Sequence, residues 1–150
     1  MKSIVVRLGA FLLAVAAATV IGCISATQFV IAALSDIGIS IPSSDRLSTT
    51  AHDVFGMGQL LYLVYGVALL VGFIVASLCK RWLPGSRQTW FTIGGAVATV
   101  TVLLLMDTIM GGMPVAGARG VSGLLGQAFA GAVAGYVYVR LTATGEIAAK

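Results

Sequence analysis

The sequence has little of the charge that a water-soluble protein needs. Only 9% of its 150 residues are charged, whereas 59% are apolar, and the mean hydropathy is +1.04. A soluble domain is about a quarter charged and about half apolar. So few polar side chains cannot cover a folded chain of this length. The composition therefore excludes a soluble globule and predicts one domain whose solvent is lipid.

Histidine, cysteine and glutamate are also scarce. His52 is the single histidine, so no His/Cys set with metal-ligand spacing can be formed. Cys23 and Cys79 fall at different depths of the apolar runs, and a disulfide needs Cα atoms within about 7 Å, so we expect none. Glu146, the sole glutamate, lies in the C-terminal tail, which excludes exporters that use a glutamate in their first membrane helix. We expect no metal and no cofactor, and the sequence favours a non-catalytic protein over an enzyme.

Apolar runs of membrane length are abundant. A transmembrane helix needs about 20 predominantly apolar residues. The sequence therefore predicts an all-α membrane protein, a bundle of four antiparallel transmembrane helices that forms a single domain over residues 1–150. The four predicted spans cover residues of about 4–33, 53–79, 89–110 and 120–141.

The first run has a second interpretation. Lys2 and Arg7 precede an apolar core that ends in Val20-Ile21-Gly22-Cys23, the pattern of a secretory signal whose cysteine is lipidated after cleavage. The run continues to Leu34, however, and is longer than the apolar core of a signal. We therefore expect an uncleaved transmembrane helix.

The only long polar segment, residues 35–52, separates the first two runs. It contains Pro42, Gly38 and several serines and threonines, which are typical of a solvated loop. The alternation of Ile37, Ile39 and Ile41 also allows a short extended piece or a segment on the membrane surface. We predict a solvated connector.

The basic residues are divided unevenly between the two ends of the predicted spans. Loops rich in lysine and arginine remain cytoplasmic. We therefore predict that both termini are cytoplasmic, in a multi-pass protein of the bacterial inner membrane. The bases lie at helix ends and form no patch with interleaved aromatics, so the net charge of +4 does not indicate a nucleic-acid partner. The side of the termini would hold Lys2, Arg7, Lys80, Arg81, Arg87, Arg140 and Lys150, and the other side Arg46 and Arg119.

The fourth run is rich in small residues and contains a Gly131-xxx-Gly135 pair. Because lipid provides no hydrophobic drive for helix association, membrane helices associate through close packing of small residues and interhelical hydrogen bonds. We expect this pair to pack within the bundle, and a subunit interface is the alternative. The expected partners are the lipid bilayer and either another membrane protein or a second copy.

Polar side chains gather toward the outer ends of the predicted spans. Asp107 precedes a Gly/Pro turn and Arg119 follows it, while Gln59, Gln127 and His52 fall at similar depth. An ionisable residue at membrane depth is costly and is a functional candidate with a named partner. Asp107 and Arg119 either lock the hairpin as an ion pair or belong to an outward-facing polar pocket with the other three. In that pocket Asp107 would exchange protons or bind a cation, and Arg119 would meet an anion or a lipid headgroup.

These features favour a small non-catalytic accessory or structural subunit that packs with other membrane proteins or with itself. The alternative is a small transporter or channel that uses the outward-facing pocket. A membrane enzyme acting on lipid or quinone is a weaker alternative, because no catalytic set of residues accompanies it.

Overall fold

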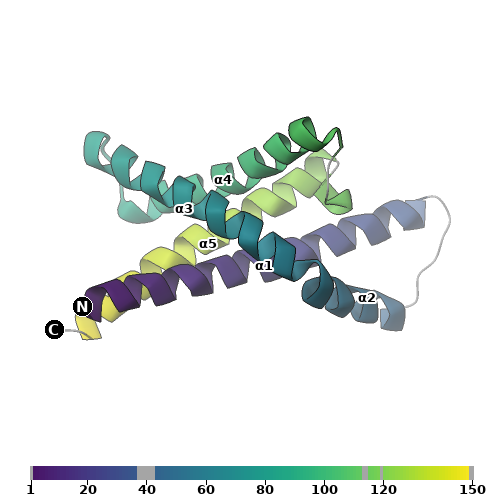
Figure 1. Ribbon diagram of the computed structural model, residues 1–150, viewed down its shortest axis with the longest axis horizontal. Helices are drawn as coiled ribbons and strands as arrows, with labels where there is room; N and C mark the ends of the chain where they lie inside the picture. The colour runs from purple at the N-terminus through teal and green to yellow at the C-terminus, as the bar shows by residue number, and fades with distance from the viewer. Residues whose placement is uncertain (1, 37–42, 113–114, 119, 149–150) are drawn as a thin grey trace.

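The computed structural model describes residues 2–36, 43–112, 115–118 and 120–148, and these parts contain helices and no strand (Figure 1). Four of the helices are long and apolar enough to cross a membrane. This confirms the prediction of an all-α chain with four helices of transmembrane length and composition. The helices are α1 (Lys2–Asp36), α2 (Ser43–Gly56), α3 (Gly58–Trp82), α4 (Arg87–Met110), the 3-10 helix η1 (Ala116–Ala118) and α5 (Val121–Ala148).

Helix α2 corrects the prediction that the connector between the first two spans is a loop, because residues 43–56 are helical. The segment contains many serines and threonines, but in the sequence Leu47, Ala51 and Val54 recur at helical spacing and outweigh the loop propensity of the hydroxyl residues. Gln28 of α1 donates to Thr50 of α2, with Nε2 and Oγ1 3.5 Å apart. The possible extended piece, residues 37–42, lies outside the described residues.

The turn between α3 and α4 follows its sequence closely. After α3 the chain is extended at Leu83, and Gly85 has φ +146°, a conformation that favours glycine. Ser86 then caps α4, because its Oγ accepts a hydrogen bond from the Thr89 amide at 3.1 Å. At the other end α4 stops at Gly111, which is left-handed with φ +69°.

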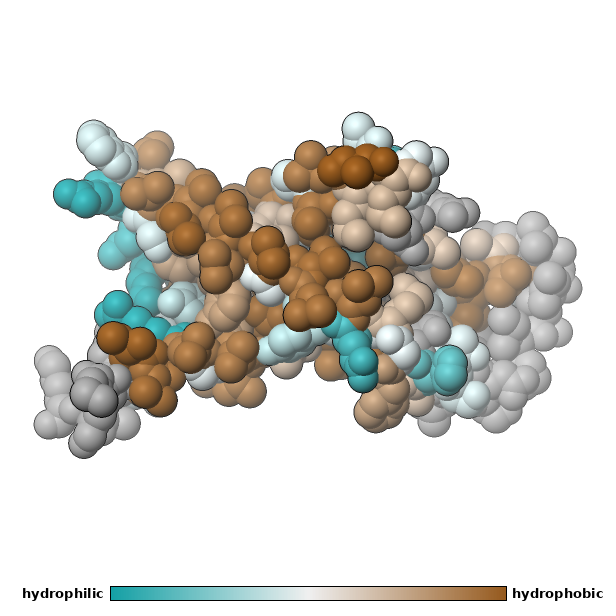
Figure 2. Space-filling model, in the orientation of Figure 1, coloured by the Kyte–Doolittle hydropathy of each residue, from teal (hydrophilic) through white to brown (hydrophobic). Residues whose placement is uncertain are grey.

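The four long helices enclose a common core. Helix α1 packs against α5, α5 against α4, α4 against α3, and α3 against α1. The start of α1, the end of α5 and the α3–α4 turn lie at the same end of the molecule (Figure 1). We call this the terminal end. Figure 2 shows hydrophilic residues gathered there, next to a broad hydrophobic surface.

Glycines bring α4 and α5 into backbone contact. A β-carbon on Gly131 would overlap the Gly95 carbonyl oxygen, and one on Gly135 would overlap the Phe91 carbonyl oxygen. Gly95, Gly131 and Gly135 are all buried. The Gly131-xxx-Gly135 pair therefore packs within the chain, as expected, and is covered by α4.

Candidate functional site

A buried polar junction connects all four spans. Gln127 of α5 and Tyr65 of α3 are both 0% exposed, and the Tyr65 hydroxyl donates to Gln127 Oε1. Gln127 Nε2 donates to the carbonyl oxygen of Gly22 in α1 at 3.1 Å. Thr99 of α4 donates from Oγ1 to the Gln127 carbonyl oxygen at 3.0 Å. We call Gly22, Tyr65, Thr99 and Gln127 the central junction.

The local sequence leaves room for this junction. A β-carbon on Gly22 would lie 2.8 Å from Gln127 Oε1 and 3.0 Å from a ring carbon of Tyr65. A larger residue at this position would force the amide or the phenol to shift away from α1. Thr99 Oγ1 also lies 3.2 Å from the Gly95 carbonyl oxygen, so its single proton has a choice of acceptors on α4 and α5.

The arrangement satisfies polar groups that would be costly in lipid. A buried amide or hydroxyl without a hydrogen bond costs several kcal/mol, on the order of 2–7 depending on the reference. Gln127 uses both its oxygen and its nitrogen, and Tyr65 uses its hydroxyl. The chemistry of the junction is therefore that of an interhelical clamp, in which each group holds a different span to α5.

The structure places the five predicted pocket residues in different environments. Gln127 is buried in the central junction, whereas the side chains of Gln59 in α3 and His52 in α2 are exposed. Asp107 is half-buried near the end of α4. Arg119 lies outside the described residues, so its ion pair with Asp107 stays a prediction.

Gln59 lies beside a separate cavity of about 480 Å³ between α1 and the junction of α2 with α3. Thr19 and Tyr62 also line this cavity. Thr19 donates to the Val15 carbonyl oxygen of its own helix at 2.9 Å, and Tyr62 donates to the Leu12 carbonyl oxygen at 3.3 Å. The hydroxyl groups of Thr19 and Tyr62, which line the cavity with Gln59, therefore already donate to backbone carbonyl oxygens.

Among the junction residues the sequence analysis proposed only Gln127 as a site candidate. By sequence Tyr65 is a core or interface aromatic, and neither Gly22 nor Thr99 was assigned to a polar site. A tyrosine in the middle of an apolar run is a usable signal, because a buried phenol needs a partner. Gln127, an amide inside another span, is the complementary signal. The partner carbonyl of Gly22 has no such signal, since any residue provides a carbonyl.

A second cluster lies toward the terminal end and is aromatic. The ring of Tyr138 stacks on Phe73 with centroids 4.8 Å apart and on Phe91 with centroids 5.4 Å apart. Phe11 meets Phe73 edge to face at 6.1 Å. Rings from α1, α3, α4 and α5 therefore join the four helices at this end, as the central junction does deeper in the molecule.

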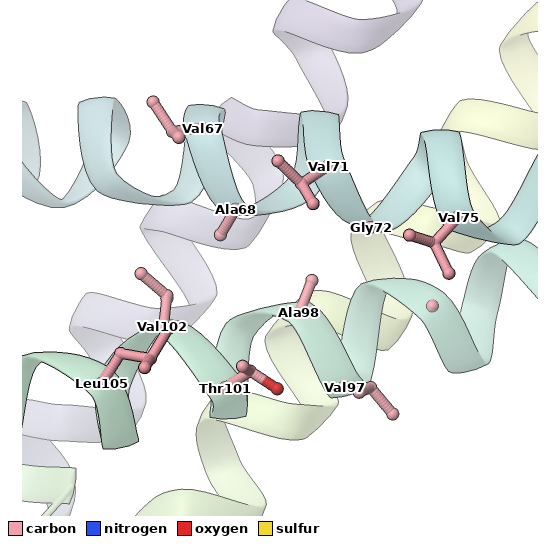
Figure 3. A pocket seen from close by; sticks show the side chains of 11 residues that line it. Val67, Ala68, Val71, Gly72, Val75, Val97, Ala98, Thr101, Val102 and Leu105 are labelled. Carbon is pink, nitrogen blue, oxygen red and sulfur yellow. The ribbon is translucent and has the colours of Figure 1, made fainter.

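An apolar groove of about 360 Å³ runs between α3 and α4. Figure 3 shows Ala68 and Val71 of α3 directed toward the side of α4 that presents Ala98 and Val102. The helices are close here, because a β-carbon on Gly72 would lie 2.6 Å from the Ala98 β-carbon. Its lining is aliphatic apart from Thr101, so the groove can accommodate hydrocarbon and offers no catalytic group.

The described residues contain no group of three or more histidine, cysteine or acidic side chains that could hold a metal ion. Cys23 is buried in α1, Cys79 is half-buried near the end of α3, and no disulfide joins these two described cysteines. Comparisons with protein-family models, with curated proteins and with solved structures find no match for this chain.

Proposed function

We propose that the protein is a small, non-catalytic subunit of a membrane assembly, which packs with another membrane protein or with a second copy of itself. The observation that supports this most directly is the use of the buried polar groups. Gln127, Tyr65 and Thr99 are engaged in bonds between helices, so they contribute to the shape of the bundle. What the molecule offers outward is a broad apolar surface on its long helices.

We further propose an antiparallel bundle with both termini in the cytoplasm of a bacterial cell. The last turn of α3 contains Lys80 and Arg81, and α4 begins at Arg87. These bases lie at the terminal end, where α1 begins with Arg7 in its first turns. The uneven distribution of bases, which retains such ends in the cytoplasm, supports this orientation.

The test is to determine which proteins, and how many copies of each, are extracted together with this chain from its native membrane. We expect particles extracted in lipid nanodiscs without detergent exchange to contain more protein than a single 15.3 kDa copy of the chain, after the mass of lipid and scaffold is subtracted. Mass spectrometry of the same sample would identify a stoichiometric second protein or a defined number of copies. A lone monomer at native expression level would overturn the proposal.

A small transporter remains the second candidate, and the cavity beside Gln59 supports it. Its test is solute or proton flux in liposomes that contain the purified protein. Flux that Gln59→Ala and Asp107→Asn each abolish, with folding unchanged, would establish a carrier. An absence of flux in the parent protein would remove this candidate.

A further inference from the structure

The cavity beside Gln59 continues into a second hollow between α1 and α3, two helices that cross one another (Figure 1). The second hollow has a volume of about 280 Å³, and Tyr62 and Leu63 line it as they line the first. Apart from Tyr62, the described residues that line it are apolar, from Phe11 in α1 to Leu70 in α3. We call the first hollow the Gln59 cavity and the second the chain groove. Because the two share side chains, one molecule can occupy both.

Large apolar side chains of the Gln59 cavity are exposed. Val20 is 43% exposed, Leu63 is 67% exposed and Phe55 is 79% exposed. An exposed apolar surface of this kind marks contact with a membrane or with a protein. On helices that cross a membrane it faces acyl chains. An occupant therefore enters from the bilayer and brings hydrocarbon with it.

The polar groups of the Gln59 cavity are available to a hydrogen-bonding head. The Gln59 side chain is exposed and makes no hydrogen bond with the described part of the chain, and an amide offers two donors and an acceptor. The hydroxyl protons of Thr19 and Tyr62 go to carbonyl oxygens of α1, so their oxygens retain lone pairs that can accept. The three groups together favour a head that donates as well as accepts, which a hydroxyl group does.

The two hollows follow one another along α3 as the head and the chain of a lipid do. Gln59 is in the first turn of the span Gly58–Trp82, at the end of the helix where the headgroup region of a bilayer lies. Leu70, in the chain groove, lies about 16 Å further along the helix at a rise of about 1.5 Å per residue. This is about half of the roughly 30 Å hydrocarbon core, the depth that an acyl chain covers in one leaflet.

From this arrangement we infer that the α1–α3 face binds an uncharged lipid with a free hydroxyl group, such as a diacylglycerol. The hydroxyl bonds with the Gln59 amide, and one acyl chain lies in the chain groove. The described lining of the Gln59 cavity offers hydrogen bonds and no countercharge, so a phosphate head would have no ionic partner among these residues. The inference goes beyond the proposed function, because it needs membrane insertion of the four spans and involves neither a protein partner nor transport.

The experiment measures the binding of radiolabelled 1,2-dioleoylglycerol to the full chain, purified in detergent and freed of native lipid. Unlabelled 1,2-dioleoylglycerol and its 3-O-methyl ether compete for the label, and the ether has the same chains with a methyl group in place of the hydroxyl proton. We expect the free alcohol to compete about fivefold more effectively, because a hydrogen bond contributes about 1 kcal/mol net. Equal competition by the alcohol and the ether would overturn the inference. Stronger competition by dioleoylphosphatidylglycerol, whose head is charged, would overturn it as well.

A pair of glutamine variants locates the head. Gln59→Leu should lower the affinity for the alcohol about fivefold and leave the ether nearly unchanged, so that the preference for the alcohol disappears. Gln88→Leu is the matched control, because it is the same substitution in the first turn of α4, outside both hollows. It should change either affinity less than twofold. Equal losses in the two variants would contradict a site at Gln59.

Gly66→Leu locates the chain. A β-carbon on Gly66 would have Val15 Cγ1 as its nearest neighbour, at 3.9 Å, so a side chain can begin there and extend into the chain groove. This variant should weaken the alcohol and the ether alike, and unchanged binding of both would contradict the chain groove.

Helix content and elution volume report the folding of each variant. Gly66→Ala, which should weaken both lipids less, replaces Gly66→Leu if the latter does not fold. The complex described under the proposed function should form in all of these variants, so the two proposals fail separately.

Discussion

At the scale of single residues, Gln127 is the side chain on which most of the interior depends. It contacts α1 through Gly22 and α3 through Tyr65, and its backbone carbonyl accepts from α4 through Thr99. In a lipid environment these bonds cannot be replaced by water. Removal of the amide would therefore leave the Tyr65 hydroxyl without its acceptor and would remove the bond to α1.

We expect Gln127→Leu to destabilise the protein by about 1–2 kcal/mol, the range found for interhelical hydrogen bonds in model membrane peptides. The measurement is thermal unfolding in a mild detergent. Gln59→Leu is the matched control, because it is the same substitution at an exposed position of α3. This variant should leave the unfolding transition unchanged. Equal effects of the two variants would contradict the central junction.

A double-mutant cycle tests the pairing itself. Tyr65→Phe removes only the hydroxyl that donates to Gln127 Oε1. If the two groups act as a pair, Gln127→Leu with Tyr65→Phe should cost less than the sum of the two single substitutions. Additive losses in the unfolding measurement would show that the groups contribute independently.

At the scale of helices, α4 and α5 depend on backbone contact at glycine. A β-carbon on Gly131 would overlap the Gly95 carbonyl oxygen, so Gly131→Ala must push the two helices apart. We expect a loss of about 1–3 kcal/mol, as for overpacked cores. The measurement is chemical or thermal unfolding of the detergent-solubilised protein.

Gly9→Ala is the control for that prediction. Gly9 is also in a helix, α1, but nothing lies within 4 Å of the β-carbon that alanine would add. Alanine has the higher helix propensity, so this variant should be neutral or more stable by up to about 1 kcal/mol. A destabilising Gly9→Ala with a neutral Gly131→Ala would contradict the described packing.

Helix-scale features also show how far sequence reasoning reaches. Composition predicted four long apolar helices, because the length of an apolar run is a local signal. The prediction of a loop where α2 forms was wrong, because the hydroxyl content is a poor guide to a segment whose apolar residues recur at helical spacing. The partners of Gln127 were not predictable, because they depend on the rotation of each helix about its axis, which the run of apolar residues does not specify.

At the scale of the whole molecule, the terminal end and the interior differ in chemistry. The terminal end combines basic side chains with the aromatic cluster. The central junction lies deeper, where polar groups bond to one another. Basic side chains gathered at one end are what the proposed orientation of the bundle in the membrane requires.

The most direct test of the proposed topology is to measure which end of α4 can be reached by a reagent from outside the cell. In a chain with Cys23→Ala and Cys79→Ser, single cysteines are placed at Leu83, in the α3–α4 turn, and at Gly112, beyond α4; both positions are exposed. A membrane-impermeant thiol reagent added to intact cells should label the cysteine at position 112 and should label position 83 only after permeabilisation. Labelling of both positions from the outside would contradict the crossing of the membrane by α4, and the reverse pattern would contradict cytoplasmic termini.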